Sequence, residues 1–230
     1  MRLAIMQPYF FPYIGYFQLI KAVDKLIFYD DVNFIKRGWI NRNRIIINNS
    51  AKHFTVQLLD ASQNKLINEV KFIDNRPKLL KTIKMAYKKA PFYKKCMPLI
   101  QEIMNYETQN ISDLAVYSVK KVCEYLDLKT QFETSSEKYT ATRGFEKSKR
   151  LKEICKLNKA SNYVNPIGGQ KIYNKEDFQK EGIKLQFIKP NITEYKQFNN
   201  EFIPGLSILD IMMFNSVADI HNMLDNYELI

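Results

Sequence analysis

The stretch MRLAIMQPYFFPYIGYFQLIKAVDKLIFYDDVNFIKRGWINRNR, residues 1–44, decides the fold of this 230-residue chain. The apolar run LAIM (3–6) is too short for a helix and opens into a turn with prolines, which is typical of a buried parallel strand. Apolar residues then recur at helical spacing from Ile14 to Val23, and LIFY (26–29) is a second short apolar run. A strand, a helix and a strand within about 30 residues predict a βαβ unit.

The rest of the chain predicts an α/β fold, with residues 1–230 as a single domain. Two β-rich runs (44–48 and 53–59) flank the turn residues NSAK and predict a β-hairpin, either at an edge of the sheet or as a flap over the site. Residues 74–127 predict consecutive helices without a strand between them, which is a helical insertion after the second sheet strand.

Strand and helix patterns alternate again after this insertion. Further strands are predicted at 130–134, 162–165 and 183–188, with a helix at 147–157. Together the patterns predict a Rossmann-like three-layer sandwich with a mainly parallel five-stranded sheet. A last helix is predicted over 207–226, and its apolar stripe suits packing within the chain or a homodimer.

The formal net charge is +11, from 35 Lys and Arg against 24 Asp and Glu. Such an excess attracts anions, although a basic and soluble surface without a specific partner explains it as well. The lysines are spread along the chain and form no dense run of the kind found in nucleic-acid arms. We therefore expect an anionic small molecule, such as a sugar nucleotide, as the partner, and no nucleic acid.

The cysteines Cys96, Cys123 and Cys155 lie far apart and form no CxxC pair, which favours reduced, buried thiols. No apolar run approaches the roughly 20 residues that cross a bilayer, and no signal peptide is apparent. We expect a cytoplasmic protein without a membrane span. The isolated His53 and His221 predict no metal site, and no pattern identifies a cofactor.

Polar residues follow the first two predicted strands, where ligands of parallel sheets bind. Gln7 and Tyr9 follow the first strand. Asp30 and Asp31 follow the second, and only one of two adjacent side chains in an extended segment can face a given cleft. We choose Asp31 as the one that faces it, as a general base, as a group that orients a sugar hydroxyl, or as a Mg²⁺ ligand.

Basic and aromatic residues continue this segment. Arginine suits bidentate contact with a pyrophosphate, and tryptophan stacks on a sugar or base. The alternative is a surface network of ion pairs around one tryptophan. The candidates for substrate contact in this segment are Asn33, Lys36, Trp39, Asn41, Arg42 and Arg44.

Two further groups lie at later strand ends. Gly168 and Gly169 follow the strand at 162–165 and suit a phosphate cradle, although a glycine pair is a weaker pattern than a complete phosphate-loop motif. Polar and basic residues after the strand at 130–134 can complete an anion pocket; they are Ser135, Ser136, Lys147, Lys149 and Arg150. Ser207 is predicted to cap the last helix, with Asp210 as its partner in the first turn.

The chain also resembles a known family in several segments. QPYFFPYIGYFQLI (7–20) followed by DDVNFIKRGWINRNRI (30–45) resembles the opening signature of the WbqC-like family of bacterial proteins. Later segments are similar to it as well: AYKKAPFY (86–93), SKRLKEIC (148–155), YVNPIGGQKIY (163–173) and FIPGLSILDIMMFN (202–215). The resemblance covers essentially the whole chain.

Members of that family occur among genes for O-antigen and other surface polysaccharides, and glycine transfer has been proposed for some. The resemblance implies a transferase that acts on an amino-sugar nucleotide or a related precursor and transfers a glycyl or acyl group to a sugar amine. The candidate catalytic residues are Asp31, Lys36 and Gln7: Asp31 deprotonates the amine, Lys36 helps Arg42 and Arg44 hold the diphosphate, and Gln7 lines the acceptor pocket with Tyr9. The alternatives are a nucleotidyltransferase-like enzyme or ATP-dependent ligase, and a non-catalytic sugar-nucleotide-binding protein.

Overall fold

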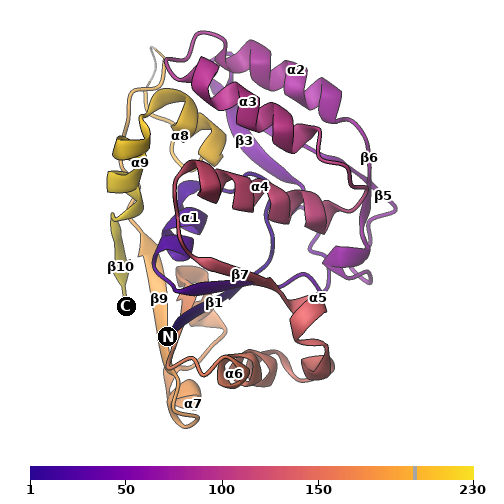
Figure 1. Ribbon diagram of the computed structural model, residues 1–230, viewed down its shortest axis with the longest axis vertical. Coiled ribbons are helices and arrows are strands. Elements are labelled where there is room, and N and C mark those ends of the chain that lie inside the picture. The colour runs from indigo at the N-terminus through magenta and orange to yellow at the C-terminus, as the bar shows by residue number, and fades with distance from the viewer. Residues whose placement is uncertain (199–200) are drawn as a thin grey trace.

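A computed structural model describes residues 1–198 and 201–230 (Figure 1). Its centre is a six-stranded sheet in the order β10-β9-β8-β1-β2-β7. The strands that pair in parallel are β1 (Arg2–Met6), β2 (Lys25–Phe28), β7 (Gln131–Thr134), β8 (Asn162–Pro166) and β9 (Lys184–Pro190). All five were predicted. The predicted number of strands is nevertheless wrong, because β10 (Tyr227–Leu229) adds a sixth, antiparallel to β9 and too short to leave an alternating pattern in the sequence.

The strand order reverses at β1. The chain passes from β1 through α1 (Ile14–Lys21) to β2 and later to β7 on one side, and then crosses to β8 and β9 on the other. The β1–β2 ladder extends to Met6 and Phe28, whereas the β1–β8 ladder is recorded only for Arg2 with Asn162 and Leu3 with Tyr163. The carboxyl ends of β1 and β8 are therefore less tightly joined than those of β1 and β2.

Helices cover both faces of the sheet. Successive side chains of a strand point to opposite faces, so each strand packs against helices on both sides. Leu3 and Ile5 belong to a buried cluster with residues of α6 (Lys147–Leu157) and α7 (Lys175–Gln179). Ala4, between them, belongs to a larger cluster with α1 and the helices packed around it. Figure 1 shows α6 and α7 on one side of β1 and β7, with α1 and α4 on the other.

The predicted helical insertion lies between β2 and β7 in the chain. It contains α2 (Arg76–Tyr87), α3 (Tyr93–Met104) and α4 (Ile111–Tyr125). Pro77 lies in the first turn of α2, where its missing N–H costs no helical hydrogen bond. Asn110 caps α4 by accepting a 2.8 Å hydrogen bond from Ser112 N. Figure 1 shows α2 and α3 at the top of the molecule, beyond α4.

The predicted hairpin forms as β3 (Arg42–Ile47) and β4 (Ser50–Thr55). Asn48 and Asn49 make its turn at φ of 49° and 60°, a conformation that asparagine tolerates better than most residues. The hairpin is a separate two-stranded sheet and does not extend the central one. The short strands β5 (Gln57–Leu59) and β6 (Lys71–Ile73) form another, with η1 (Ile67–Glu69) between them.

The prediction of one continuous last helix over residues 207–226 is wrong. The segment is divided into α8 (Ile208–Phe214) and α9 (Val217–Leu224). Ser216 and Asp219 form a capping box that starts α9, and this stops one helix from continuing into the next. The remaining short helices are α5 (Ser135–Lys138), η2 (Thr140–Thr142) and η3 (Ile167–Lys171).

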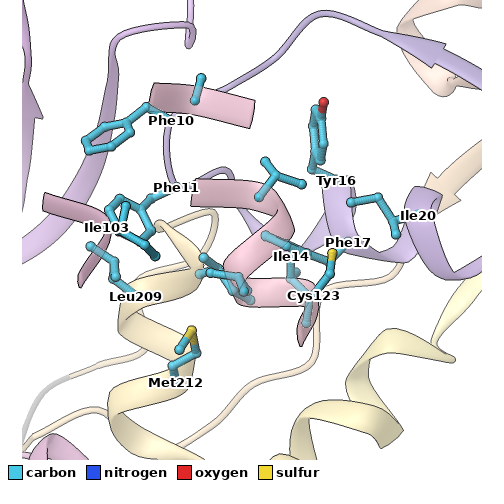
Figure 2. Close-up of a cluster of buried hydrophobic side chains, with 14 of the residues drawn as sticks. Phe10, Phe11, Ile14, Tyr16, Phe17, Ile20, Ile103, Cys123, Leu209 and Met212 are labelled. Carbon is cyan, nitrogen blue, oxygen red and sulfur yellow. The ribbon is translucent and has the colours of Figure 1, made fainter. Parts of the chain in front are cut away.

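The apolar stripe of α8 and α9 is used for packing within the chain. Figure 2 shows Leu209 and Met212 of α8 in the same cluster as Phe11, which follows β1, and Ile103 of α3. Ile14, Phe17 and Ile20 of α1 lie beside Cys123 of α4 in that view. The aromatic residues after β1 therefore join the sheet to the helical insertion.

The three cysteines are all buried. Cys96 and Cys123 lie in the cluster around α1, and Cys155 lies in the cluster around α6. Among the described residues, no helix combines the length and the apolar character that crossing a membrane requires.

Candidate functional site

The parallel register of β2 and β7 brings polar residues together at the carboxyl edge of the sheet. Phe28 pairs with Thr134, so the residues that follow the two strands meet. Asp30 Oδ1 accepts a 3.0 Å hydrogen bond from Ser136 N, and Asp30 Oδ2 accepts a 2.7 Å bond from Ser136 Oγ. The amino end of α5 is thus capped by a carboxylate of the protein itself.

Asp31 points toward α6, and its side chain is fully buried. Its Oδ2 accepts hydrogen bonds from Arg150 Nη2 at 2.6 Å and from Arg143 Nε at 3.0 Å. Ser135 Oγ donates to Oδ1. We call this group the sheet-end cluster; its members are Asp30, Asp31, Ser135, Ser136, Arg143 and Arg150.

These contacts decide the ionisation of Asp31. Burial on its own would raise the pKa of the carboxyl group, but the hydrogen bonds from Arg150, Ser135 and Arg143 outweigh it, and the pKa is lowered. A carboxylate with a lowered pKa is a weak proton acceptor at neutral pH. The arrangement therefore suits Asp31 for holding two arginines better than for removing a proton.

The two arginines differ in access to solvent. Arg150 is buried, donates from Nε to Thr142 Oγ1 at 3.0 Å, and lies 4.8 Å from the ring centroid of Tyr29. Arg143 has 47% of its side chain exposed, and within the described residues its only other side-chain hydrogen bond is a 3.5 Å bond from Nη2 to Ser136 O. Arg143 can therefore reach a ligand while Asp31 holds one edge of its guanidinium group.

Gln7 and Tyr9 are half-buried in the segment after β1. Gln7 O accepts a 2.8 Å hydrogen bond from Tyr16 Oη, and the Tyr9 ring centroid lies 5.6 Å from that of Tyr16. Burial, with a smaller contribution from Tyr13, raises the pKa of Tyr9 to about 12. Tyr9 is therefore a hydrogen-bond donor at neutral pH.

A second group lies on the hairpin, and we call it the hairpin cluster: Trp39, Arg42, Arg44 and His53. Arg44 and His53 are directly opposite each other on β3 and β4. The Cζ atoms of Arg42 and Arg44 lie 5.9 and 6.0 Å from the Trp39 ring centroid, and the His53 ring centroid is 6.0 Å from it. Four of the chain's basic and aromatic side chains thus share one surface.

The other predicted residues of this segment have different surroundings. Asn41 is buried and donates from Nδ2 to Val56 O at 2.9 Å, and Asn33 donates to Gln63 O at 2.7 Å. Both side chains support loop backbone. Lys36 is exposed and makes no ion pair with any residue that the structure describes.

The predicted glycine pair lies within η3, just after β8. Gly168 is open, since a Cβ there would meet no atom within 4 Å. Gly169 is buried, and a Cβ there would lie 2.0 Å from Asn165 Oδ1. Asn165 Nδ2 in turn donates to Tyr163 Oη at 2.6 Å. Gly169 therefore makes room for a buried amide, whereas a role as phosphate cradle stays a prediction.

The predicted residues thus fall into separate groups. Within residues 1–198 and 201–230, no hydrogen bond, ion pair or ring contact joins Asp31 to Arg42 or Arg44. The single hollow shared by Gln7, Asp31 and Arg42 stays a prediction. Of the pocket expected after the strand at 130–134, the structure brings Ser135, Ser136 and Arg150 together.

Two features were not predicted. Arg143 follows the short helices after β7, and no spacing in TATRGFEK distinguishes it from a surface arginine. The surroundings of Asp210, which was predicted only as a capping partner of Ser207, are the other: its carboxylate is buried and accepts hydrogen bonds from Tyr87 Oη at 2.6 Å, Tyr195 Oη at 2.6 Å and Gln197 Nε2 at 2.9 Å. An acidic residue inside the apolar run ILDIMM was a usable signal for it.

Ser207 caps α8, as predicted, by accepting a 3.3 Å hydrogen bond from Leu209 N. Asp210 is not its side-chain partner in a capping box. Among the described residues, no group of three or more His, Cys, Asp or Glu side chains is placed to hold a metal ion.

Comparisons with known proteins give a family match over most of the chain. The family model of the WbqC-like protein family matches residues 7–222. The chain is 28% identical over 223 residues to a Mycobacterium tuberculosis (strain ATCC 25618 / H37Rv) protein described as "Uncharacterized protein Rv1507c", covering 95% of each chain. No solved structure matches it significantly. Because the family model spans nearly the whole sequence, from the loop after β1 into α9, the chain belongs to the WbqC-like protein family.

Proposed function

We propose that this protein is a transferase that acts on an amino-sugar nucleotide or a related surface-polysaccharide precursor, and that it transfers a glycyl or similar acyl group to a sugar amine. The family's association with surface-polysaccharide genes supports the class of substrate. The observation that carries the choice of site is the buried Asp31, which holds the half-exposed Arg143 at the carboxyl edge of the sheet. The proposal treats the sheet as Rossmann-like: the strand order reverses at β1, where such sheets bind ligands, and Gln7 and Tyr9 follow that strand.

Each residue has a distinct part in the proposal. Arg143 contacts the anionic group of the substrate, since a guanidinium forms paired hydrogen bonds with phosphate or carboxylate. Asp31 and Arg150 fix its position, and Gln7 and Tyr9 line the pocket of the acceptor sugar. Asp31 is not the base in the proposed reaction, because its lowered pKa makes it a poor proton acceptor.

The proposed reaction forms one amide bond. The sugar amine attacks the carbonyl carbon of an activated acyl donor, the donor's leaving group departs with its electron pair, and it takes up the proton that the amine loses. Nucleotide-activated sugars are made inside the cell, so the proposal also places the protein in the cytoplasm.

The test is incubation of the protein with dTDP- or UDP-amino sugars and activated glycine donors, followed by mass spectrometry of the sugar. A gain of one glycyl group is expected, with Arg143→Ala lowering the rate by at least about tenfold through the loss of a charge-assisted contact. Lys180→Ala, an exposed charge on the turn after α7, is the matched control and should keep the activity. No mass gain with any donor and acceptor pair removes the glycyl claim, and release of pyrophosphate from ATP points to a ligase instead.

A further inference from the structure

The hairpin cluster carries positive charge that the described part of the chain does not neutralise. Arg42 donates from Nε to Gly38 O at 3.0 Å and from Nη2 to Arg37 O, and Arg44 donates from Nη2 to Gly205 O at 3.0 Å. These acceptors are backbone carbonyls, which orient a guanidinium group without cancelling its charge. No ion pair recorded among the described residues involves Arg42 or Arg44, in contrast to Arg143 and Arg150.

One donor of Arg44 has no acceptor among the residues that the structure describes. Arg44 Nε is buried and makes no hydrogen bond within the described part of the chain. A buried donor without a partner is unfavourable, so an oxygen that reaches this atom is favoured. Gly205 permits the close approach of Arg44, because its φ is +67° and a Cβ there would lie 3.1 Å from Nη2.

The same surface offers a flat apolar face. Trp39 is 38% exposed, and the guanidinium groups of Arg42 and Arg44 lie over its ring, so a ligand reaches the indole over the part that they leave exposed. A ligand that stacks on the indole can therefore place a charged substituent near Arg42 or Arg44. His53, exposed on the opposite strand, bounds this surface.

We propose that the hairpin cluster is a second ligand site, separate from the sheet-end cluster, for a molecule that joins a ring able to stack on an indole to a phosphate group. The indole of Trp39 receives the ring, and Arg42 and Arg44 bind the phosphate oxygens. The ring is a base or a sugar, so the ligand is a nucleoside phosphate or a sugar phosphate. The inference rests on the charge and geometry of the hairpin and does not require the proposed acyl transfer.

The chain is suited to a direct measurement, because Trp39 is its only tryptophan. Tryptophan fluorescence therefore reports on this site alone. The probes are uridine diphosphate, glucose 1-phosphate, inorganic pyrophosphate and uridine. We expect saturable quenching by a probe that has both ring and phosphate, and weaker or no quenching by pyrophosphate and uridine, which each lack one part. The stronger of the first two identifies the ring.

Variants separate this site from the sheet-end cluster. Arg44→Gln and Arg42→Gln should each weaken the quenching by about tenfold or more, because each removes charge-assisted hydrogen bonds worth about 1.5–3 kcal/mol. Arg44→Lys keeps the charge without the planar fork and should fall between Arg44→Gln and the unmodified protein. Arg143→Ala should leave the quenching unchanged, even where it abolishes transfer. Thermal unfolding of each variant shows whether it is folded.

The outcomes distinguish the two proposals. Quenching that is absent with all four probes, or unchanged in a folded Arg44→Gln, overturns the second site. Quenching that Arg143→Ala abolishes shows one shared site and overturns the separation. Failure to detect acyl transfer alongside normal quenching contradicts the proposed function alone.

Discussion

Asp31 and Asp210 are both buried carboxyl groups, yet their surroundings differ in one respect. Two arginines contact Asp31, whereas two tyrosines and a glutamine contact Asp210. Burial raises the pKa of Asp210, and its neutral donors offset this only in part. For Asp31 the charged donors exceed the effect of burial, and the pKa falls.

Asp31→Asn is expected to destabilise the protein by about 3–5 kcal/mol at neutral pH, because it leaves the buried Arg150 without its counter-charge. A carboxyl group with a lowered folded-state pKa stabilises above its unfolded pKa, and this contribution disappears as the pH falls through the folded value. The difference between the variant and the unmodified protein should therefore shrink on acidification below about pH 4. Urea unfolding across this range measures it; a difference that grows toward acid contradicts the ion-pair interpretation.

Asp210→Asn is expected to show the opposite pH dependence. A raised folded-state pKa means that the native protein holds the proton more tightly, so stability falls as the pH rises from the unfolded pKa toward the folded one. Relative to Asp210→Asn, the unmodified protein should lose about 1.4 kcal/mol for each unit by which the pKa is raised. The same urea series serves as the measurement. Stability that rises with pH relative to the variant would show that the tyrosine and glutamine donors fully stabilise the ionised carboxylate.

At the scale of elements, polar contacts join the segments that follow the parallel strands to the helices after them. The β2–β7 register places Asp30 against the start of α5, and β8 leads directly into η3. The packing is tight at Gly169, where an added Cβ would lie 2.0 Å from Asn165 Oδ1. The shape of this segment is therefore sensitive to single atoms.

Gly169→Ala tests this packing. Its Cβ must displace the Asn165 amide, which is hydrogen-bonded to Tyr163, and we expect a loss of about 1–3 kcal/mol in unfolding free energy. Gly168→Ala is the matched control, because its Cβ meets no atom and the change should stay within about 0.5 kcal/mol. Thermal or urea unfolding of the two variants decides; equal losses argue against close packing of Gly169.

At the scale of the whole molecule, two apolar clusters lie on opposite faces of one sheet. The strands of the sheet contribute to both clusters, but few side chains do. The clusters are therefore connected through the sheet, while each packs largely on its own. Ile20 of α1 and Ile154 of α6 are fully buried, one in each cluster. This placement suits a double-mutant test.

Ile20→Val and Ile154→Val should each cost about 0.5–1.5 kcal/mol, the usual price of one buried methylene. Their losses of unfolding free energy should add within about 0.5 kcal/mol, because the two side chains lie in different clusters. Equilibrium unfolding of both single variants and the double variant measures the coupling. A larger coupling energy means that the sheet transmits packing changes from one face to the other.

Most of the fold could be predicted, because strands 2–6 and 26–29 are short apolar runs bounded by turn residues, and the helices of the insertion have clear apolar spacing. The errors lie where local patterns are weak. β10 is only three residues long, and the break before α9 depends on a cap at Ser216 within an otherwise helical run. Pairing with β9 determines β10, whereas a local cap ends the helical run before α9.

Less of the candidate site could be predicted. The position of Asp31 at a strand end is visible in the sequence, but its partners Arg143 and Arg150 are 112 and 119 residues away. Sequence order places Arg42 and Arg44 near Asp31, whereas the fold directs them to the hairpin and the loop around Gly205. The register of β2 with β7 in the folded chain brings Arg143 and Arg150, and not Arg42 or Arg44, to Asp31.

The three buried cysteines are built-in probes of local opening. Burial raises the pKa of Cys96, Cys123 and Cys155, with that of Cys155 near 12, so in the closed protein each is neither reachable nor ionised. A thiol reagent can modify them only during the moments when the surrounding structure comes apart. Two of them lie in the cluster around α1 and one in the cluster around α6. Their labelling rates therefore measure how often each cluster opens to solvent, without any engineered probe.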